Sequence, residues 1–224
     1  MTDHQLEHLI TVADPRSPVS EAYRALRTNL DFSSLDRPIR TMLVTSAGPE
    51  EGKSTVLANL AVTTAQAGKK VILVDGDLRR PTLHHIFNLK NDVGLTTMVV
   101  DDAAMESPPL QDTGVEGLQL LPSGPLPPNP SELLGSRRME EIIAVLLERA
   151  DIVFFDAPPV VAVTDAAVLA TKVDGVLLVI YAGRTRRDYA RAARARLEKV
   201  NANLLGAVLN NVRFDVGLHR YYAT

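Results

Sequence analysis

Short, continuous apolar runs recur along the chain at 42–44, 71–74, 152–155, 175–180 and 204–209, and 117–121 is a further plausible strand. Each run is too short for a core helix, and the lack of polar alternation is typical of parallel strands buried on both faces. Between the runs lie stretches with apolar spacing of three and four residues, at 56–67, 131–147, 164–171 and 185–199. This order predicts an α/β fold: a doubly wound, mostly parallel sheet flanked by helices.

A further helix is predicted at about 17–32, because Ser17 is a suitable N-cap and Pro18 suits the first helical position. On a wheel of about 100° per residue, one side of this helix is apolar. That side holds Val19, Ala22, Tyr23, Leu26 and Leu30, and the opposite side holds Glu21, Arg24 and Arg27. From composition alone, a solvated surface is the default interpretation of the charged side. Residues 1–16 are polar, and we expect a surface arm there.

Two regions give less information. Residues 82–115 mix short apolar groups with polar residues and proline, and no element is predicted for them. Residues 122–130 contain five prolines in nine positions, which favours a stiff connector over a PxxP ligand segment.

Composition predicts one soluble domain covering residues 1–224. The 224 residues are 46% hydrophobic and 23% charged, with no internal repeat or linker. The chain has no cysteine, which excludes disulfides and thiolate metal sites. No run is long enough to span a bilayer, and residues 1–10 are too polar for a signal peptide, so a cytoplasmic location is expected. A net charge of -3 gives no reason to expect a nucleic-acid partner.

The strongest motif lies at 41–55, where an apolar run leads into a small-residue turn and then a helix. Backbone N–H groups at such a helix start attract phosphate, and Gly52 lets the ligand approach the backbone closely. Lys53 is expected to reach the outer phosphates, and the Ser54 hydroxyl to bind Mg²⁺. Ala47 stands where the motif usually has its first glycine.

Three acids follow predicted strands: Asp75 and Asp77 after 71–74, and Asp156 after 152–155. Ligands of open α/β sheets bind at the carboxyl ends of the strands, so these carboxylates are expected beside the phosphate loop. One carboxylate can hold the metal while another accepts a proton from the attacking hydroxyl or water. We expect Asp75 to be the base and Asp77 and Asp156 to bind metal, although the sequence does not distinguish Asp75 from Asp77 in these roles.

With these motifs the chain resembles the bacterial tyrosine kinases (BY-kinases), P-loop kinases of capsule and exopolysaccharide synthesis. The resemblance covers nearly the whole chain. Residues 47–55 match the Walker A segment, 71–79 the additional Walker A′ segment and 152–159 Walker B. The stretch 127–134 and the pattern Glu21-x-x-Arg24-x-x-Arg27 match as well.

The resemblance implies Mg²⁺-dependent transfer of the ATP γ-phosphoryl group to tyrosine, with ATP and Mg²⁺ as cofactors. Lys53, Asp75, Asp77 and Asp156 become the catalytic candidates, and Ser54, Asp77 and Asp156 the metal ligands. The implied nucleotide-binding residues are Gly48, Glu51, Gly52, Lys53, Ser54, Thr55, Asn211 and Arg213. Related P-loop ATPases read adenine near the last strand, although Asn210-Asn211 is equally a turn signal.

The resemblance also implies a ring of identical subunits. Glu21, Arg24 and Arg27 would join neighbouring subunits, which replaces the default interpretation of that face as solvated. Tyr221 and Tyr222, in a tail at about 214–224, would be phosphorylated in the next subunit's site. This tail has only two adjacent tyrosines, where family members usually have a cluster.

The implied partners are a separate membrane activator, which would hold the chain at the inner face of the membrane, a tyrosine phosphatase, and substrates from sugar metabolism. The basic stretch 185–199 is expected to be a solvated face, with a partner, anionic lipid or DNA as alternatives.

Two other functions remain open. A ParA/MinD-like ATPase acting as a positioning switch shares the fold, but its signature lysine after the first Walker A position is replaced here by Gly48. A nucleotide-binding module without catalysis would bind ATP and form no phosphotyrosine.

Overall fold

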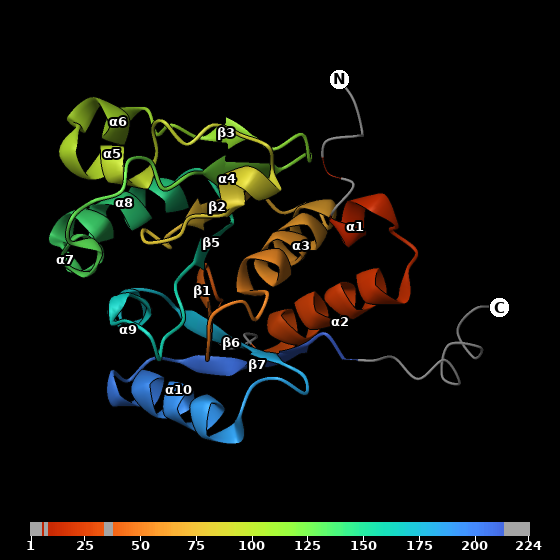
Figure 1. Ribbon diagram of the computed structural model, residues 1–224. Helices are drawn as coiled ribbons and strands as arrows, with labels where there is room; N and C mark the ends of the chain where they lie inside the picture. The colour runs from red at the N-terminus through yellow and green to blue at the C-terminus, as the bar shows by residue number, and fades with distance from the viewer. Residues whose placement is uncertain (1–5, 7–8, 34–37, 213–224) are drawn as a thin grey trace.

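A computed structural model describes residues 6, 9–33 and 38–212 of the chain. Within these residues a seven-stranded sheet runs in the order β3-β4-β2-β5-β1-β6-β7 (Figure 1). All pairings are parallel except that of β3 with β4. The strands are β1 (Thr41–Ser46), β2 (Val71–Asp75), β3 (Gln111–Asp112), β4 (Leu118–Leu121), β5 (Ile152–Asp156), β6 (Gly175–Tyr181) and β7 (Leu204–Asn210).

Helices cover both faces of the sheet. One face packs against α1 (Ile10–Ala13), α2 (Pro18–Ser33), α3 (Lys53–Gln66) and α4 (Leu83–Ile86). The other packs against α5 (Leu95–Val100), α6 (Asp102–Glu106), α7 (Pro130–Gly135), α8 (Arg137–Leu147), α9 (Asp165–Ala170) and α10 (Arg187–Lys199). Among the described helices, none is both long and apolar enough to cross a bilayer. The predicted doubly wound α/β fold is confirmed.

The central strands are buried throughout because successive side chains enter two different cores. In β5, Phe155 packs in the core beneath α8 and α9, whereas Phe154 packs in the core beneath α3. Both rings are at most 2% exposed. Burying one such side chain stabilises the fold by about 1.5–3 kcal/mol, so both faces of each central strand contribute.

One predicted helical stretch is divided in the structure. Residues 131–147 form α7 and α8, which are separated at Ser136. Ser136 has extended backbone angles, and its hydroxyl accepts a hydrogen bond from the N–H of Met139. The apolar spacing continues across the break because both helices pack on the same core. Residues 82–115, for which nothing was predicted, contain α4, α5, α6 and β3.

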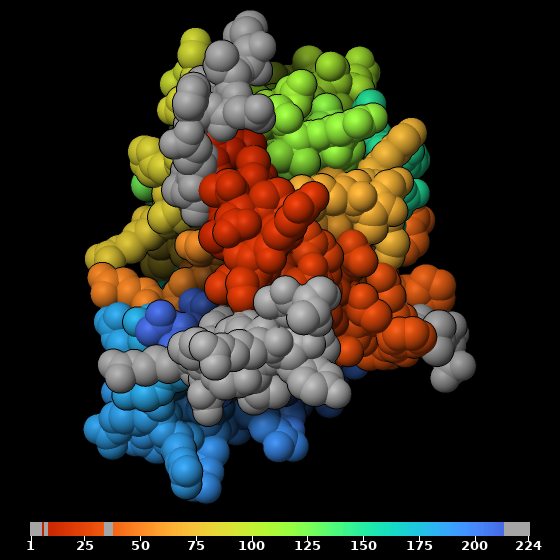
Figure 2. Space-filling view, turned by 90° about the vertical axis from the view of Figure 1, so that its right-hand side faces the viewer, coloured from red at the N-terminus to blue at the C-terminus, as the bar shows by residue number. Residues whose placement is uncertain are grey.

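The expectation of a surface arm at residues 1–16 is wrong for its described part. Leu9 is fully buried, and Thr11 is 1% exposed. The carboxamide oxygen of Asn59, a buried residue of α3, accepts hydrogen bonds from the Thr11 N–H at 3.1 Å and its hydroxyl at 2.8 Å. In the space-filling view (Figure 2), the red α1 region lies flat against the orange helices. The short α1 depends on these tertiary contacts, which a pattern of local spacing does not contain.

The wheel placed the buried side of α2 correctly only in part: Tyr23, Leu26 and Leu30 pack on the core as expected. Ser17 caps the helix as predicted, since its hydroxyl accepts from the Ser20 N–H at 3.1 Å. However, Val19 is 37% exposed, and Ala22 is also exposed. Arg27, expected on the outer side, instead donates to the Thr63 carbonyl of α3 at 2.9 Å. The buried side is therefore rotated toward Ser20, Tyr23, Arg27 and Leu30, because α2 must also satisfy polar groups of α1 and α3.

Replacing Leu9 with alanine should lower the free energy of unfolding by about 2–4 kcal/mol, because it leaves a cavity between α1 and α3. Val19→Ala, at an exposed position of α2, should change it by less than about 0.5 kcal/mol. Denaturant unfolding of both variants measures the difference. Equal midpoints for Leu9→Ala and the unmodified chain would show that α1 adds nothing to the core.

Candidate functional site

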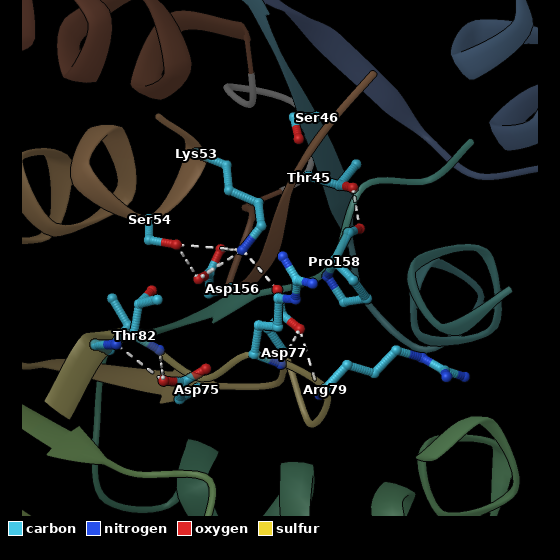
Figure 3. Close-up of polar contacts among 12 residues, drawn as sticks. Thr45, Ser46, Lys53, Ser54, Asp75, Asp77, Arg79, Thr82, Asp156 and Pro158 are labelled. Atoms are coloured by element: carbon cyan, nitrogen blue, oxygen red, sulfur yellow. Dashed lines mark hydrogen bonds and ion pairs between the residues drawn. The ribbon is translucent and has the colours of Figure 1, made fainter. Parts of the chain in front are cut away.

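Three neighbouring strands bring the predicted acids to one end of the sheet. β5 lies between β2 and β1, and its Asp156 is in register with Asp75 of β2 and Val44 of β1. The turn after β1 leads into α3 and carries Lys53, while Asp77 follows β2 by two residues. Figure 3 shows Lys53 reaching from α3 toward Asp77 and Asp156, with Asp75 nearby. The predicted convergence of the loop and the acids is thus present.

The first turn of α3 presents backbone N–H groups without a side-chain cap. Gly52 is the N-cap residue, and no side chain accepts a hydrogen bond from the N–H groups that follow it. Its φ of +82° is a conformation that favours glycine, and an added Cβ would lie 2.3 Å from Nδ2 of Asn210. Such uncapped N–H groups, together with the helix dipole, make a suitable phosphate-binding end.

Lys53 holds the acidic cluster together. Its Nζ lies 2.9 Å from Oδ2 of Asp77, 3.1 Å from both carboxylate oxygens of Asp156 and 3.2 Å from the hydroxyl of Ser54. Burial disfavours the charged amine, but the carboxylates of Asp156 and Asp77 outweigh it and raise the pKa of Lys53 to about 12. The lysine is therefore a fixed positive charge at neutral pH.

Asp156 is fully buried at the end of β5. It accepts a short hydrogen bond from the Ser54 hydroxyl in addition to the contacts with Lys53. Burial raises the pKa of Asp156, although Lys53 and Ser54 act in the opposite direction. Its oxygens and the Ser54 oxygen thus lie side by side, as a shared metal ion would require.

Asp77 is positioned by its own turn. One carboxylate oxygen accepts from the N–H groups of Arg80 at 3.0 Å and Arg79 at 3.4 Å, and the other faces Lys53. Its side chain is only 6% exposed. The turn leaves one oxygen of Asp77 directed at the site.

Asp75 has one satisfied and one unsatisfied oxygen. Oδ2 accepts from the N–H groups of Thr82 at 3.0 Å and Leu83 at 2.9 Å. Oδ1 is buried and has no hydrogen-bond partner among the described residues. Burial, and then the nearby Asp156 charge, raise the pKa of Asp75 to about 8. A buried oxygen without a partner is unfavourable, and it marks a place for a group that the substrate supplies.

The donor set fits Mg²⁺ chemically. Hydroxyl and carboxylate oxygens are the ligands that this ion prefers, and it usually completes its shell with phosphate oxygens and water. Within the described part of the chain, no group of three His, Cys, Asp or Glu residues is arranged to hold a metal ion by itself. These side chains therefore suit a metal ion whose remaining ligands are phosphate oxygens and water.

An ion pair between a buried carboxylate and a half-exposed arginine, beside the site, was missed by sequence reasoning. Asp165, at the start of α9, is fully buried and accepts from Arg79 at 2.8 and 3.0 Å and from the Ser131 hydroxyl at 2.6 Å. Arg79 directly follows the turn that orients Asp77, so this contact anchors the Walker A′ segment to α7 and α9. The signal available was the pair Arg79-Arg80 shortly after Asp77, which has no meaning without the distant partner of Arg79.

Other predicted residues have different surroundings. The carboxylate of Glu51 is buried and bonded within the protein, so only its backbone could contact a phosphate. Gly48 is part of the turn and its carbonyl accepts from Ser46, while Thr55 is exposed at the start of α3. Asn211 donates to the Tyr181 hydroxyl at 2.6 Å and lines a surface hollow of about 460 Å³.

Glu21 and Arg24 form an exposed ion pair on α2. In the basic stretch, Arg186 and Arg194 pair with neighbouring acids of α10, and Arg196 donates to carbonyls of the loop after β5. Arg213, Tyr221 and Tyr222 lie outside the described residues.

Comparison with known proteins agrees with this geometry. Residues 42–222 match the family model described as the CobQ/CobB/MinD/ParA nucleotide binding domain. The chain is similar to the tyrosine-protein kinase YwqD of Bacillus subtilis (strain 168), with 44% identity over 97% of this chain and 92% of that protein.

Solved structures give the same result. The crystal structure of the chimerical protein CapA2B2 has a TM-score of 0.88 and 40% identity, over 92% of this chain and 90% of that chain. The septum site-determining protein MinD of Pyrococcus horikoshii OT3, complexed with Mg-ADP, is more distant, with a TM-score of 0.64 and 25% identity over 76% and 69% of the two chains.

Replacing Asp165 with asparagine should lower the free energy of unfolding by about 1–2 kcal/mol at pH 7, because an NH2 group replaces the oxygen that accepts from Nε of Arg79 and the negative charge is lost. Burial alone would raise the pKa of Asp165, but the hydrogen bonds from Arg79 and Ser131 hold it below its ordinary 3.8. The contribution of the carboxylate is thus complete above about pH 4 and is lost as pH falls through this lowered value. Urea unfolding at pH 7 and at pH 3 tests both parts, with the exposed Asp92→Asn as control. A loss that is the same at both pH values would contradict the role of the ion pair.

Proposed function

The chain belongs to the CobQ/CobB/MinD/ParA nucleotide-binding family and, within it, to the bacterial tyrosine-protein kinases, and from this we propose that it transfers the γ-phosphoryl group of ATP to tyrosine. The observation that carries the proposal is the position of Lys53. It stands at the uncapped start of α3, within ion-pair distance of Asp77 and Asp156. This arrangement provides a cation for the phosphates and carboxylates for the metal at one point.

In this proposal Lys53 exchanges partners when ATP binds. The N–H groups that follow Gly52 bind the phosphates, and the lysine amine moves from the carboxylates to the outer phosphate oxygens. Ser54, Asp77 and Asp156 would hold Mg²⁺, and the ion would supply positive charge next to the transferring phosphoryl group. Lys53 occupies the place of that positive charge in the nucleotide-free protein, so the acids are never left uncompensated.

Asp75 is proposed to act as the base. Its Oδ1 has no hydrogen-bond partner in the described part of the chain, while Oδ2 is held by the start of α4. The phenolic oxygen of the acceptor tyrosine forms a bond to the γ-phosphorus, the bond to the β-γ bridging oxygen breaks, and ADP leaves. The phenolic proton passes to Oδ1 of Asp75. Asp77 has both oxygens engaged, which favours Asp75 over Asp77 for this role.

The acceptors are proposed to be Tyr221 and Tyr222 of a neighbouring copy in a homo-oligomeric ring. The Glu21–Arg24 pair leaves a polar, exposed side of α2 available for that contact, whereas Arg27 is used within the subunit. A separate membrane activator would hold the protein at the inner face of the membrane, where it would regulate capsule or exopolysaccharide synthesis. A phosphatase and substrates of sugar metabolism would complete this regulation.

The second candidate is a positioning ATPase of the MinD type. Its support is the fold it shares with the MinD structure. Gly48 occupies the position of the signature lysine of those ATPases, and the tyrosines near the end of the chain have no role in that function. The kinase is therefore the preferred proposal.

Lys53→Met should reduce phosphotyrosine formation by about 100-fold or more, because a preorganised charge on the transferring group is lost. Lys69→Met is the matched control, since Lys69 forms an exposed pair with Asp31 on the surface. Purified proteins are incubated with ATP and Mg²⁺, with and without a candidate activator, and phosphotyrosine is quantified by mass spectrometry. Thermal unfolding shows whether both variants fold. Phosphotyrosine at the level of the unmodified chain in Lys53→Met would reject the proposed site.

Replacing both Tyr221 and Tyr222 by phenylalanine should remove most of the autophosphorylation while ATP binding is unchanged. The aromatic side chains remain, and only the acceptor hydroxyls are lost. Tyr189→Phe, at a half-exposed position of α10, serves as control. Phosphopeptide mapping identifies the modified positions. Undiminished phosphotyrosine in the double variant would show that the acceptor tyrosines lie elsewhere in the chain.

A further inference from the structure

The phosphate loop contains a buried acid whose position needs an explanation. Glu51 directly precedes Gly52 in the loop that is proposed to receive a triphosphate, and it is only 5% exposed. An uncompensated carboxylate there would repel the ligand and would be costly to bury. Both of its oxygens are instead engaged: Oε2 accepts from the Ala47 N–H at 3.1 Å, and Oε1 accepts from the Thr185 hydroxyl at 2.6 Å.

Thr185 is itself firmly held. It lies in the turn between β6 and α10, where its hydroxyl oxygen accepts from the Tyr181 N–H at 2.9 Å. Its own N–H donates to the Tyr181 carbonyl at 3.0 Å. The hydroxyl hydrogen can therefore be directed only toward Glu51 without losing these contacts, so the turn presents one fixed donor to the loop.

The end of β7 and the turn after β6 also hold the loop, at positions next to the Glu51 carboxylate. Asn210, the last residue of β7, donates to the Glu51 carbonyl at 2.9 Å. Arg184 pairs with the Glu50 carboxylate at 3.2 Å on the surface. Glu50 has a φ of +56°, which a residue with a side chain rarely adopts, so the loop needs external contacts to keep its shape.

We propose that Thr185 is a positioning residue for nucleotide binding. Through Glu51, its hydroxyl keeps the loop from Ala47 to Gly52 in the conformation whose N–H groups receive the phosphates. The proposal rests on the proposed ATP-binding function and adds a residue that is more than 130 positions from the loop in sequence. Because the contact is made before ATP binds, its effect is to preorganise the loop, and it should appear in affinity more than in the rate of phosphoryl transfer.

The test compares Thr185→Val, which removes the hydroxyl at nearly constant volume, with Thr185→Ser, which restores it. Thr171→Val is the matched control, since Thr171 directly follows α9 and its hydroxyl donates to the Val168 carbonyl of that helix. The dissociation constant of a fluorescent ATP analogue with Mg²⁺ should rise about tenfold or more in Thr185→Val, as expected for a hydrogen bond to a charged group. In Thr185→Ser the dissociation constant should return to within about twofold of that of the unmodified chain, and kcat at saturating ATP should be unchanged.

Amide hydrogen exchange of the nucleotide-free protein gives a second readout. Exchange should accelerate at 47–54 in Thr185→Val, with the amides of β1 and β5 unaffected. Glu51→Gln should have a similar effect on affinity, because the amide can accept only one of the two hydrogen bonds. Adding Thr185→Val to the Glu51→Gln variant should then lower the affinity for the ATP analogue much less than Thr185→Val does in the unmodified chain. This is expected when the two residues act through each other.

Wild-type affinity together with unchanged exchange at 47–54 in Thr185→Val would overturn the proposal, and so would additive effects in the double variant. If Thr185→Val does not fold, Thr185→Ala is measured in the same way. If the unmodified chain binds the analogue but forms no phosphotyrosine, the kinase proposal fails while the affinities still decide the role of Thr185. If it binds no nucleotide, hydrogen exchange alone decides whether Thr185 holds the loop.

Discussion

Three carboxylates and one amine share the carboxyl end of the sheet, and the structure depends on how their charges are balanced. Asp75 and Asp156 are almost completely buried, and Asp77 is nearly so. Lys53 compensates Asp77 and Asp156 directly, while Asp75 has its pKa raised to about 8 by burial and by the charge of Asp156. One amine offsets part of this negative charge, and it does so only while the lysine stays among the acids. A phosphate ligand that draws the lysine away must therefore bring its own cation, which gives a physical reason to expect Mg²⁺ together with the nucleotide.

The sheet makes this concentration of charge possible. β2, β5 and β1 are adjacent and parallel, so the residues that follow them reach one edge whatever their separation along the chain. The apolar side chains on both faces of these strands fix the register, and a shift by one residue would turn Asp156 away from Asp75. The free energy of hydrophobic burial thus holds the acids in an arrangement that their own repulsion would disperse.

A second set of contacts fixes the loops around the charged centre. Asp165 anchors Arg79, which follows the turn of Asp77, and Thr185 anchors Glu51, which precedes the turn at Gly52. In each case a buried carboxylate joins a loop of the site to a helix start or turn far away in sequence. Such contacts reduce the conformational free energy that is lost when a ligand binds, since the loops already have the required shape.

The sequence by itself determined the fold class, the phosphate loop and the three acids, because each depends on local patterns: continuous apolar runs, a glycine and lysine before a helix, and acids directly after strands. It did not determine the docking of α1, the buried side of α2 or the division between α7 and α8. It also gave no sign of the pairs Arg79–Asp165 and Glu51–Thr185. The physical reason, for all of these features except the local break at Ser136, is that they arise between segments 36 to 134 positions apart, where the energy of a contact depends on packing geometry and not on neighbouring residues. Only the tertiary structure brings such groups within hydrogen-bonding distance.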